Sequence, residues 1–303
     1  MKIYNNANLS QKHLGSVIAI GNFDGLHIGH QKVINEAKQK AKKNKLPFGV
    51  MTFEPVPVMF FNKDIKNHRI NSLEQKKNQL KILKIDFLII IKFNKTFSNL
   101  SPEEFIEKII FKKTKCQYLY VSKNFRFGFK RQGNIKTLKK FEKKYNYKNI
   151  ITKPYKKNDK TISSTFIRKK IREGKIELVN KLLDRSWCVE GKVIKGKKRG
   201  RKIGFPTCNI NLNNYVIPKI GVYAVKVKVG VLNKKGIANV GYRPTFNGQN
   251  LLLETNIFGI NKNLYNKVIS VNFKKFLRSE KKFKNFDYLK KQIKIDIRQA
   301  KKK

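Results

Sequence analysis

The chain has 303 residues, enough for two ordinary domains, and its 40% hydrophobic content supplies material for their cores. No apolar run approaches the roughly 18 residues of a membrane-spanning helix, so we expect no membrane partner. The formal net charge is +51, but Lys is spread along the whole chain and is enriched together with Asn, Ile and Phe, which all have AT-rich codons. We therefore attribute the charge to base composition and expect no specific nucleic-acid partner.

The first half of the chain alternates short apolar runs with helical patterns. Four of the runs have the length of strands that are buried on both faces: SVIAI (16–20), FGVMTF (48–53), FLIII (87–91) and YLYV (118–121). The stretch SPEEFIEKII begins with a capping box, in which Ser101 is the N-cap, Pro102 the first helical residue and Glu104 the third. This alternation predicts right-handed βαβ units and a Rossmann-like parallel sheet, which binds ligands beyond the carboxyl ends of its strands.

The pattern changes after a closing helix, IELVNKLLDRSW (176–187). From there on, runs with strand-like alternation are separated by turn residues: VYAVKVKV (222–229), GIANVGY (236–242), LLLETNIF (251–258) and KVISVNFKKFL (267–277). Because no long helical pattern precedes the tail FDYLKKQIKIDIRQA (286–300), we expect an antiparallel sheet or a small antiparallel β-barrel that ends in a helix. We place the domain boundary so that residues 1–184 form the α/β domain and residues 185–303 the barrel domain.

The first predicted strand is followed by GNFDGLHIGH (21–30), which has the features of a phosphate site. Gly21 and Gly25 let the backbone turn tightly and approach a ligand, and the helix that follows offers N–H groups and the positive end of its dipole. His27 and His30 can donate hydrogen bonds to a phosphate whose charge grows in a transition state. The alternative is that both histidines only cap the helix and pack.

Zinc is a second alternative for these histidines, and the sequence argues against it. A zinc ion needs a third and usually a fourth ligand. The chain has only four histidines; the other two, His13 and His68, stand in unrelated contexts, and no cysteine is near GNFDGLHIGH. We therefore expect no zinc.

A second stretch, KTISSTFIRKKIREG (160–174), fits the same phosphate chemistry. Ser163, Ser164 and Thr165 stand at the start of a predicted helix, and Arg168 lies one turn in. Hydroxyls, open N–H groups and a guanidinium together would hold an oligophosphate. The simpler interpretation is a serine cap with a surface arginine.

In the second half, GKKRGRKIGFPTCNI (196–210) is a basic, glycine-rich loop that leads into a strand. Its glycines permit close approach to phosphate. Thr207 and Asn209 are short oxygen-bearing side chains that suit Mg²⁺. A plain surface hairpin is the alternative.

Glu254 is flanked by apolar residues on a predicted strand. A carboxylate there must be paired or functional, because an unpaired buried charge is costly. It is either a general base for a hydroxyl nucleophile or half of a structural ion pair.

These stretches together resemble a known family. The motifs GNFDGLHIGH, TFEPVP (52–57), NFRFGFKRQG (124–133) and ISSTFIR (162–168) resemble the FMN adenylyltransferase domain of the bacterial bifunctional riboflavin kinase/FAD synthetases, within the HIGH nucleotidyltransferase superfamily. Five later stretches resemble the riboflavin kinase module in the family's order: GRKIGFPTCNI (200–210), GVYAVKV (221–227), ANVGYRPTF (238–246), LETNIFGINKNLYNK (253–267) and FLRSEKKFKNFDYLKKQI (276–293). The resemblance covers nearly the whole chain.

The resemblance implies a substrate set and a role for each candidate residue. Riboflavin, FMN and ATP are the expected small-molecule substrates, and Mg²⁺ is expected with ATP. In the adenylyltransferase half, the expected catalytic residues are His27, His30, Asn124 and Arg168, and the expected nucleotide or phosphate ligands are Gly21, Phe23, Gly25, Ser163, Ser164 and Thr165. In the kinase half, we expect Glu254 as the base, Thr207 and Asn209 at Mg²⁺, Gly196, Gly200, Gly204 and Pro206 in the nucleotide loop, and Arg278 near the flavin.

Four positions depart from the family pattern. The family often has His at Val56, Gly at Ser122 and Arg at Phe166, and it usually has Ala at Cys208. The first three lie in the adenylyltransferase half, so a riboflavin kinase with weakened adenylyltransferase activity is one alternative function. A basic RNA-binding protein is a second alternative function. The sequence argues against it, because the KMSKS lysines are missing and no anticodon-binding module is evident.

Cysteine usage bears on the location of the protein. Cys116, Cys188 and Cys208 are scattered and form no CxxC pair, which favours a reducing compartment. The N-terminal stretch MKIYNNANLSQK lacks the apolar run of a signal peptide. We therefore expect a cytoplasmic protein.

Overall fold

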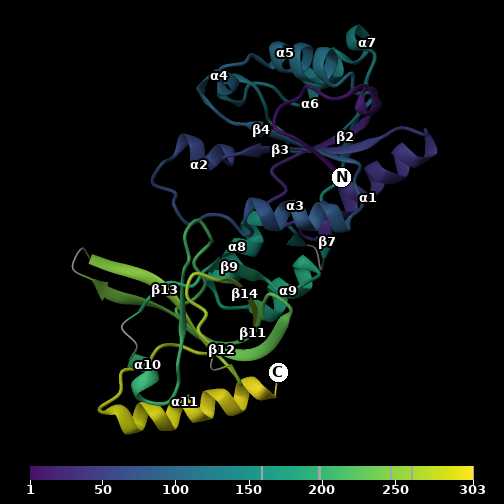
Figure 1. Cartoon of the computed structure of the whole chain (residues 1–303). Helices are drawn as coiled ribbons and strands as arrows, with labels where there is room; N and C mark the ends of the chain where they lie inside the picture. The colour runs from purple at the N-terminus through teal and green to yellow at the C-terminus, as the bar shows by residue number, and fades with distance from the viewer. Residues whose placement is uncertain (158–159, 197–198, 246–247, 261, 303) are drawn as a thin grey trace. The chain divides into compact units, whose positions relative to one another are not determined.

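The computed structural model describes residues 1–157, 160–196, 199–245, 248–260 and 262–302 (Figure 1). Contacts divide the chain into two compact units: unit 1, of residues 1–66 and 73–163, and unit 2, of residues 67–72 and 164–303. The helices α8 (Ser164–Arg172) and α9 (Ile176–Leu183) therefore group with the second half of the chain. The predicted boundary between residues 184 and 185 separates two sequence modules, which need not coincide with the two compact units, and it stays a prediction.

Unit 1 contains the predicted parallel sheet. Its strands stand in the order β1-β4-β3-β2-β5-β6, and each neighbouring pair is parallel. The strands are β1 (Lys2–Tyr4), β2 (Val17–Ile20), β3 (Phe48–Glu54), β4 (Phe87–Lys92), β5 (Tyr118–Ser122) and β6 (Lys148–Thr152). The four strands predicted from apolar runs are confirmed, and β1 and β6 add the two edges. Since β3 and β5 lie on opposite sides of β2, the end of β2 is the topological switch point of the sheet.

Alternate strand residues pack into two separate cores. Ile18 and Ile89 belong to one core, together with Phe105 of the helical segment after β4. Val17 and Leu88 belong to the other core, which also holds apolar residues of the helices α1 (Ile28–Lys43) and α3 (Leu73–Ile82). Figure 1 shows α1 and α3 on one face of the sheet and α4 to α7 on the other. Because helices cover both faces, the strands read as continuous apolar runs.

The segment that opens with SPEEF begins with the predicted capping box. The Ser101 hydroxyl accepts from the N–H of Glu104 at 3.0 Å, and the Glu104 carboxylate accepts from the N–H of Ser101 at 2.9 Å. The helix then continues as a π-helix over Phe105–Lys113, which the sequence did not predict. The other short elements of unit 1 are η1 (Gln11–His13), α2 (Pro57–Phe61), α4 (Lys95–Ser98), α5 (Pro102–Glu104), η3 (Phe129–Arg131), α6 (Ile135–Lys140), α7 (Glu142–Tyr145), β7 (Lys156–Lys157) and β8 (Lys160–Thr161).

Unit 2 contains an antiparallel sheet in the order β10-β13-β12-β11-β14-β9. Its strands are β9 (Cys188–Lys192), β10 (Cys208–Asn211), β11 (Gly221–Val229), β12 (Leu232–Thr245), β13 (Gly248–Ile257) and β14 (Val268–Arg278). A bridge between Ile194, just after β9, and Asn209 of β10 brings the two edges of the sheet together. The sheet is therefore nearly closed, and the predicted barrel is confirmed.

The predicted terminal helix, α11 (Phe286–Lys301), packs against the barrel. Ile293, Ile297 and Ala300 recur at helical spacing and contact Ala224 and Ile237. A short helix, α10 (Arg199–Lys202), interrupts the glycine-rich loop, where the sequence predicted only a loop.

Unit 2 also includes the hexapeptide 67–72 from the first half of the chain. The N–H of Arg69 donates to the carbonyl of Asn214 at 2.7 Å. The indole N–H of Trp187, which is fully buried, donates to the carbonyl of Ile70 at 2.9 Å. These bonds make the hexapeptide part of the framework of unit 2, although it stands more than 90 residues before α8 in the chain.

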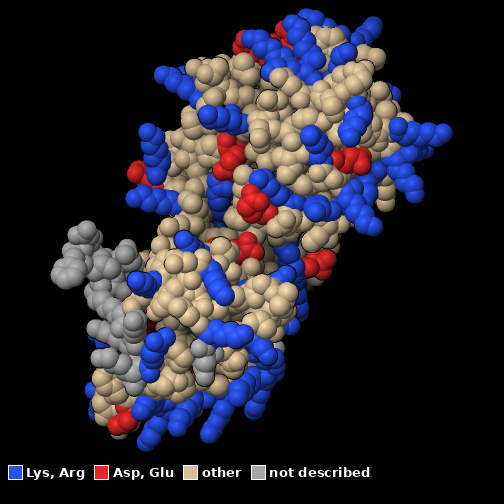
Figure 2. Space-filling view, in the orientation of Figure 1, with Lys and Arg blue, Asp and Glu red and all other residues tan. Residues whose placement is uncertain are grey.

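Lys and Arg side chains are spread over the visible face in Figure 2, with other residues between them. This distribution agrees with a compositional origin of the charge. Among the described residues, no helix has both the length and the apolar character needed to cross a membrane.

Candidate active sites

The loop after β2 places the GNFDGLHIGH stretch at the switch point of the sheet. Its backbone is left-handed at three positions, with φ of +46° at Phe23, +83° at Gly25 and +40° at Leu26. Such a conformation costs a residue other than glycine roughly 1–2 kcal/mol, so the surroundings must impose it. Phe23 and Leu26 are both buried and anchor the turn in the core. A Cβ at Gly21 would lie 3.3 Å from the Phe23 ring, which makes this position tight as well.

The two histidines stack on each other at the N-terminus of α1. Their ring centroids are 3.7 Å apart, with an angle of 22° between the ring planes. His27 is the N-cap of α1, because its Nδ1 accepts a hydrogen bond from the backbone N–H of His30 at 3.4 Å. A ring nitrogen that accepts carries no proton, so the neutral His27 ring has its proton on Nε2. Capping and donation to a phosphate are therefore compatible, since they use different nitrogens.

Gly29 stands between the two histidines, and the stacking requires its small size. A Cβ at this position would lie 3.1 Å from the His27 ring and 3.3 Å from the Cβ of Tyr155. A larger residue would therefore require the His27 ring or Tyr155 to shift by a few tenths of an ångström.

The serine-rich stretch lies at the start of α8, as predicted. Arg168 is buried on this helix, and its Nε donates to the carbonyl of His68 at 2.8 Å. The interpretation of Arg168 as a surface arginine is therefore wrong. Because Ser164 and Arg168 belong to unit 2 and His27 to unit 1, a phosphate site built from both stretches stays a prediction. Ser163 and Ser164 are half-buried, and Thr165 is exposed.

Asn124 and the three departures of the first half occupy different environments. Asn124 lies in an exposed turn just after β5, and Ser122 is the exposed last residue of that strand. Val56 is the buried N-cap residue of α2. The Nζ of Lys170 lies 5.3 Å from the centroid of the Phe166 ring, one turn along α8. The role of Asn124 and the effect of the departures stay predictions.

Three polar residues stand in one row across the barrel sheet. Glu254 of β13 is in register with Asn209 of β10 on one side and with Asn239 of β12 on the other. Directly opposed Cβ atoms in such pairs lie about 4.5–5.5 Å apart. Leu253 and Thr255 are fully buried, so the half-buried Glu254 points to the other face of β13. The structure thus brings Glu254 and Asn209 together, as a joint site requires.

The glycine-rich loop lies close to this row. A Cβ at Gly196 would lie 1.9 Å from Nδ2 of Asn209, and a Cβ at Gly200 would lie 2.4 Å from the carbonyl oxygen of Phe205. At Gly200 the obstacle is backbone, so a side chain does not fit, whereas at Gly196 a side chain would displace the Asn209 amide. Gly204 has a φ of +84°, which glycine adopts without strain. Positions 197 and 198 of the loop lie outside the described residues.

The residues around Thr207 fit a magnesium ion. Asn209 is buried, and within the part of the chain that the structure describes its Oδ1 has no hydrogen-bond partner. Thr207, two residues earlier, is exposed, and the Nδ2 of Asn256 fixes the turn before it by donating to the carbonyl of Pro206 at 2.7 Å. An amide oxygen and a hydroxyl are the hard ligands that Mg²⁺ prefers. Burial raises the pKa of the Cys208 thiol, which lies between the two residues.

Arg278, which was expected near the flavin, is bound to the terminal helix. Its Nε and Nη2 donate to the carboxylate of Asp296 on α11, the shortest bond being 2.7 Å. The Asp296 side chain is 2% exposed, and Gln292 also donates to it, at 2.9 Å. The sequence did not predict this structural role, and the role of Arg278 toward the flavin stays a prediction.

Replacing Arg278 with Ala is expected to lower the free energy of unfolding by about 3–5 kcal/mol, because Asp296 would remain buried without its partner. The double variant Arg278→Met with Asp296→Leu should recover most of this loss, since apolar pairs often replace buried ion pairs at little cost. Urea denaturation of the parent and both variants measures the effect. A loss below about 1 kcal/mol in the single variant, as for a surface pair, would contradict the prediction.

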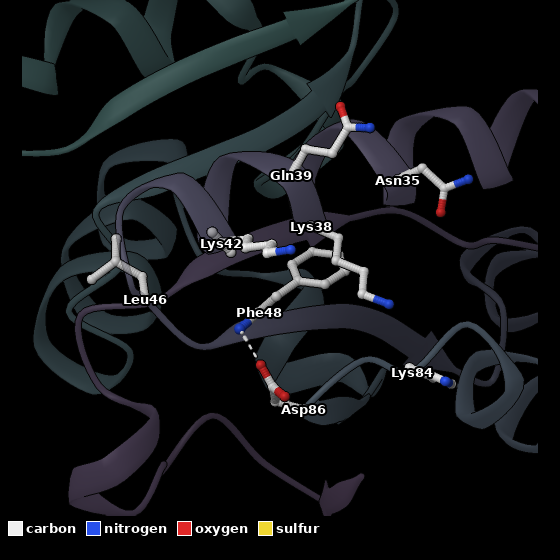
Figure 3. Close-up of a pocket in the computed structure, with 9 residues that line it drawn as sticks. Asn35, Lys38, Gln39, Lys42, Leu46, Phe48, Lys84 and Asp86 are labelled. Atoms are coloured by element: carbon white, nitrogen blue, oxygen red, sulfur yellow. Dashed lines mark hydrogen bonds between the residues drawn. The ribbon is translucent and has the colours of Figure 1, made fainter.

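A pocket of about 440 Å³ lies at the other end of the sheet of unit 1 (Figure 3). Its lining includes Phe48, the first residue of β3, and Asp86, which directly precedes β4. The Asp86 carboxylate accepts from the backbone N–H of Phe48 at 2.8 Å. Because these are the amino ends of the strands, the pocket is not part of the site after β2.

Lys76 is a residue at the switch point that the sequence did not single out. It is buried on α3, and its Nζ donates to the carbonyl of Asn22 at 2.7 Å. The available signal was its spacing, since Leu73, Lys76 and Leu80 fall on one helical face. A lysine on an apolar face is unusual, because charged side chains are rarely fully buried without partners.

The fold and the two candidate sites fit a transferase with two separate sites. Unit 1 has a loop and a helix N-terminus of the kind that binds anions, at the switch point of an α/β sheet, and unit 2 has a carboxylate in register with an amide side chain. Two family models match this chain: FAD synthetase over residues 9–166 and riboflavin kinase over residues 183–303.

Named relatives match over nearly their whole length. The bifunctional riboflavin kinase/FMN adenylyltransferase of Buchnera aphidicola subsp. Schizaphis graminum is 42% identical over 97% of this chain and 96% of its own. The protein of the same name from Bacillus subtilis is 38% identical over 96% and 93%, respectively. A crystal structure of a protein named macrolide-efflux protein, from Streptococcus pneumoniae, is 29% identical, with a TM-score of 0.86 over 99% of this chain and 98% of that one.

The chain therefore belongs to the bifunctional riboflavin kinase/FMN adenylyltransferase family. The family resemblance and the fold class predicted from the sequence are both confirmed.

Proposed function

We propose that this chain phosphorylates riboflavin to FMN with ATP and then transfers the adenylyl group of a second ATP to FMN, which gives FAD and pyrophosphate. Both activities are those of the family to which the chain belongs. The observation that carries the residue assignment is the register of Glu254 with Asn209 beside the Pro206–Thr207 turn.

In the kinase reaction, the riboflavin hydroxyl attacks the γ-phosphorus of ATP, and ADP leaves. A neutral alcohol is a weak nucleophile, so it benefits from a base, and Glu254 takes its proton. Thr207 and Asn209 would hold a Mg²⁺ ion, which neutralises the charge of the ATP phosphates when bound. The glycines at 196 and 200 let the backbone come close to these phosphates.

In the adenylyltransferase reaction, an oxygen of the FMN phosphate attacks the α-phosphorus of ATP, and pyrophosphate leaves. This nucleophile is already anionic near neutral pH, so no general base is required. What the reaction needs is positioning and stabilisation of the growing charge. The Nε2–H of His27, the ring of His30 and the N-terminus of α1 supply it, and we assign Asn124, Ser164 and Arg168 to the same step.

Incubation of the purified chain with riboflavin, ATP and Mg²⁺ tests the proposal, with FMN and FAD resolved by chromatography. FMN should appear first and FAD later. Accumulation of FMN without FAD would favour a riboflavin kinase with weakened adenylyltransferase activity. In that case, Val56, Ser122 and Phe166 would be the first positions to change back to the residues that the family often has there. No FMN would contradict the proposal. Omission of Mg²⁺ should abolish FMN formation.

We propose that both reactions take place in the cytoplasm.

A further inference from the structure

A buried lysine lies beneath the loop that follows β2. Lys76, in the first turn of α3, is 2% exposed. Its Nζ donates to the carbonyl of Asn22 at 2.7 Å and to the hydroxyl of Thr52 at 3.2 Å. Burying an ammonium is costly unless hydrogen bonds replace its water. For folding alone, a third leucine beside Leu73 and Leu80 would serve as well.

The carbonyl that Lys76 binds is at the entry to the loop. Asn22 directly precedes Phe23, the first left-handed residue, and the loop ends at the cap formed by His27. A bond to this carbonyl therefore sets the direction in which the backbone enters the turn. An error of about 1 Å in the position of catalytic groups can cost roughly 10²-fold in rate.

Thr52 shares the same carbonyl. Its hydroxyl donates to the carbonyl of Asn22 at 3.2 Å and accepts from Lys76. Asn22 thus has two donors, of which only one is charged. The neutral hydrogen bond from Thr52 and the positive charge of Lys76 can therefore be removed separately by substitution.

The positive charge of Lys76 acts in the same sense as the dipole of α1. Both favour an anion at the loop, and a buried charge is screened less by salt than the many surface lysines. Charge that is fixed in place before the reaction stabilises charge that develops in the transition state.

We propose that Lys76 is a positioning residue of the adenylyltransferase half, which holds the Asn22 carbonyl and adds a buried positive charge behind the phosphate-binding loop. This inference rests on the proposed function of that loop. Lys76 acts through the backbone of Asn22 and through its field, and it does not itself transfer protons or phosphoryl groups.

Three variants of the full chain separate the contributions. Lys76→Met removes the charge and leaves the Thr52 donor in place. Thr52→Val removes the neutral donor and leaves the charge. Lys77→Met is the matched control, because Lys77 is the next residue of the same helix and its ion pair, with Glu74 at 2.6 Å, is exposed.

The readouts are the kcat and KM of FAD formation, the affinity for inorganic pyrophosphate by calorimetry, and riboflavin phosphorylation in the same preparation. Lys76→Met should lower kcat/KM for ATP in FAD formation by about 10–100-fold and weaken pyrophosphate binding by about tenfold. Thr52→Val and Lys77→Met should stay within about threefold of the parent, since both retain the charge of Lys76. Riboflavin phosphorylation should be unchanged in all three.

Two results would overturn the inference. In the first, the kcat/KM of Lys76→Met in FAD formation stays within threefold of the parent. In the second, Thr52→Val lowers kcat/KM as much as Lys76→Met does, so that the positive charge has no role of its own. Circular dichroism checks that each variant is folded, and Lys76→Gln, which keeps a neutral donor, replaces Lys76→Met if that variant does not fold. A parent chain that makes no FAD contradicts the proposed function instead, and the pyrophosphate affinities still decide on Lys76.

Discussion

Replacing Glu254 with Gln is expected to lower the kcat of riboflavin phosphorylation by about 10²–10⁴-fold, the usual contribution of a general base. The substitution keeps the size of the side chain and its place in β13, opposite Asn209 and Asn239. It removes only the ability to accept the proton of the riboflavin hydroxyl. Conversion of FMN to FAD should continue in the same preparation, because that reaction uses an anionic nucleophile and residues assigned to the other half of the chain.

Glu190 offers a matched control on the same sheet. It lies on β9 and accepts a hydrogen bond from the Ser270 hydroxyl at 2.9 Å. Glu190→Gln should leave both activities within about twofold of the parent, because the amide oxygen of Gln can still accept this hydrogen bond. If Glu254→Gln retained full kinase activity, the base would have to be another group, and if it lost both activities, two independent sites would be ruled out.

Much of the fold is predictable from the sequence because its core elements have local signals. Strands covered by helices on both faces, such as 87–91, appear as uninterrupted apolar runs of strand length. The start of the helix at Pro102 is encoded within four residues by its capping box. The alternation over 225–228 likewise indicates one buried face, since Val225 and Val227 are buried in β11 whereas Lys226 and Lys228 are exposed.

What could not be predicted depends on contacts between distant parts of the chain. The hexapeptide 67–72 carries no apolar period of its own, and its bonds to Asn214 and Trp187 exist only in the folded unit. The same holds for Arg278, whose partner Asp296 stands on a helix 18 residues away. Periodicity can assign Asp296 to a helix, but it cannot identify the guanidinium that faces it.

The candidate sites divide in the same way. Loop chemistry around His27 and Thr207 was visible as residue types at fixed spacing. The pairing of Asn209 with Glu254 was not, because strand register depends on which strands become neighbours. Lys76 was missed for a related reason: its partner is the carbonyl of Asn22, and every residue has a backbone carbonyl, so the sequence does not indicate which one a lysine binds.

His27 caps α1 in this structure, and we propose that it also donates to a phosphate; a pair of variants separates the two roles. His27→Ala removes both the helix cap and the Nε2–H donor, whereas His27→Asn keeps a good cap and removes only the imidazole. His27→Ala should lower the free energy of unfolding by about 1 kcal/mol, and His27→Asn by only a few tenths.

Both variants should slow FAD formation by about 10²–10³-fold, the usual loss when one donor to developing charge is removed. His30→Ala should have a similar effect without the loss of the cap, because the cap uses the backbone N–H of His30 and not its ring. Riboflavin phosphorylation is the internal control and should not change. If His27→Asn restored FAD formation along with stability, capping would be the whole role of His27. If it restored stability alone, its imidazole would have to act on the reacting phosphates.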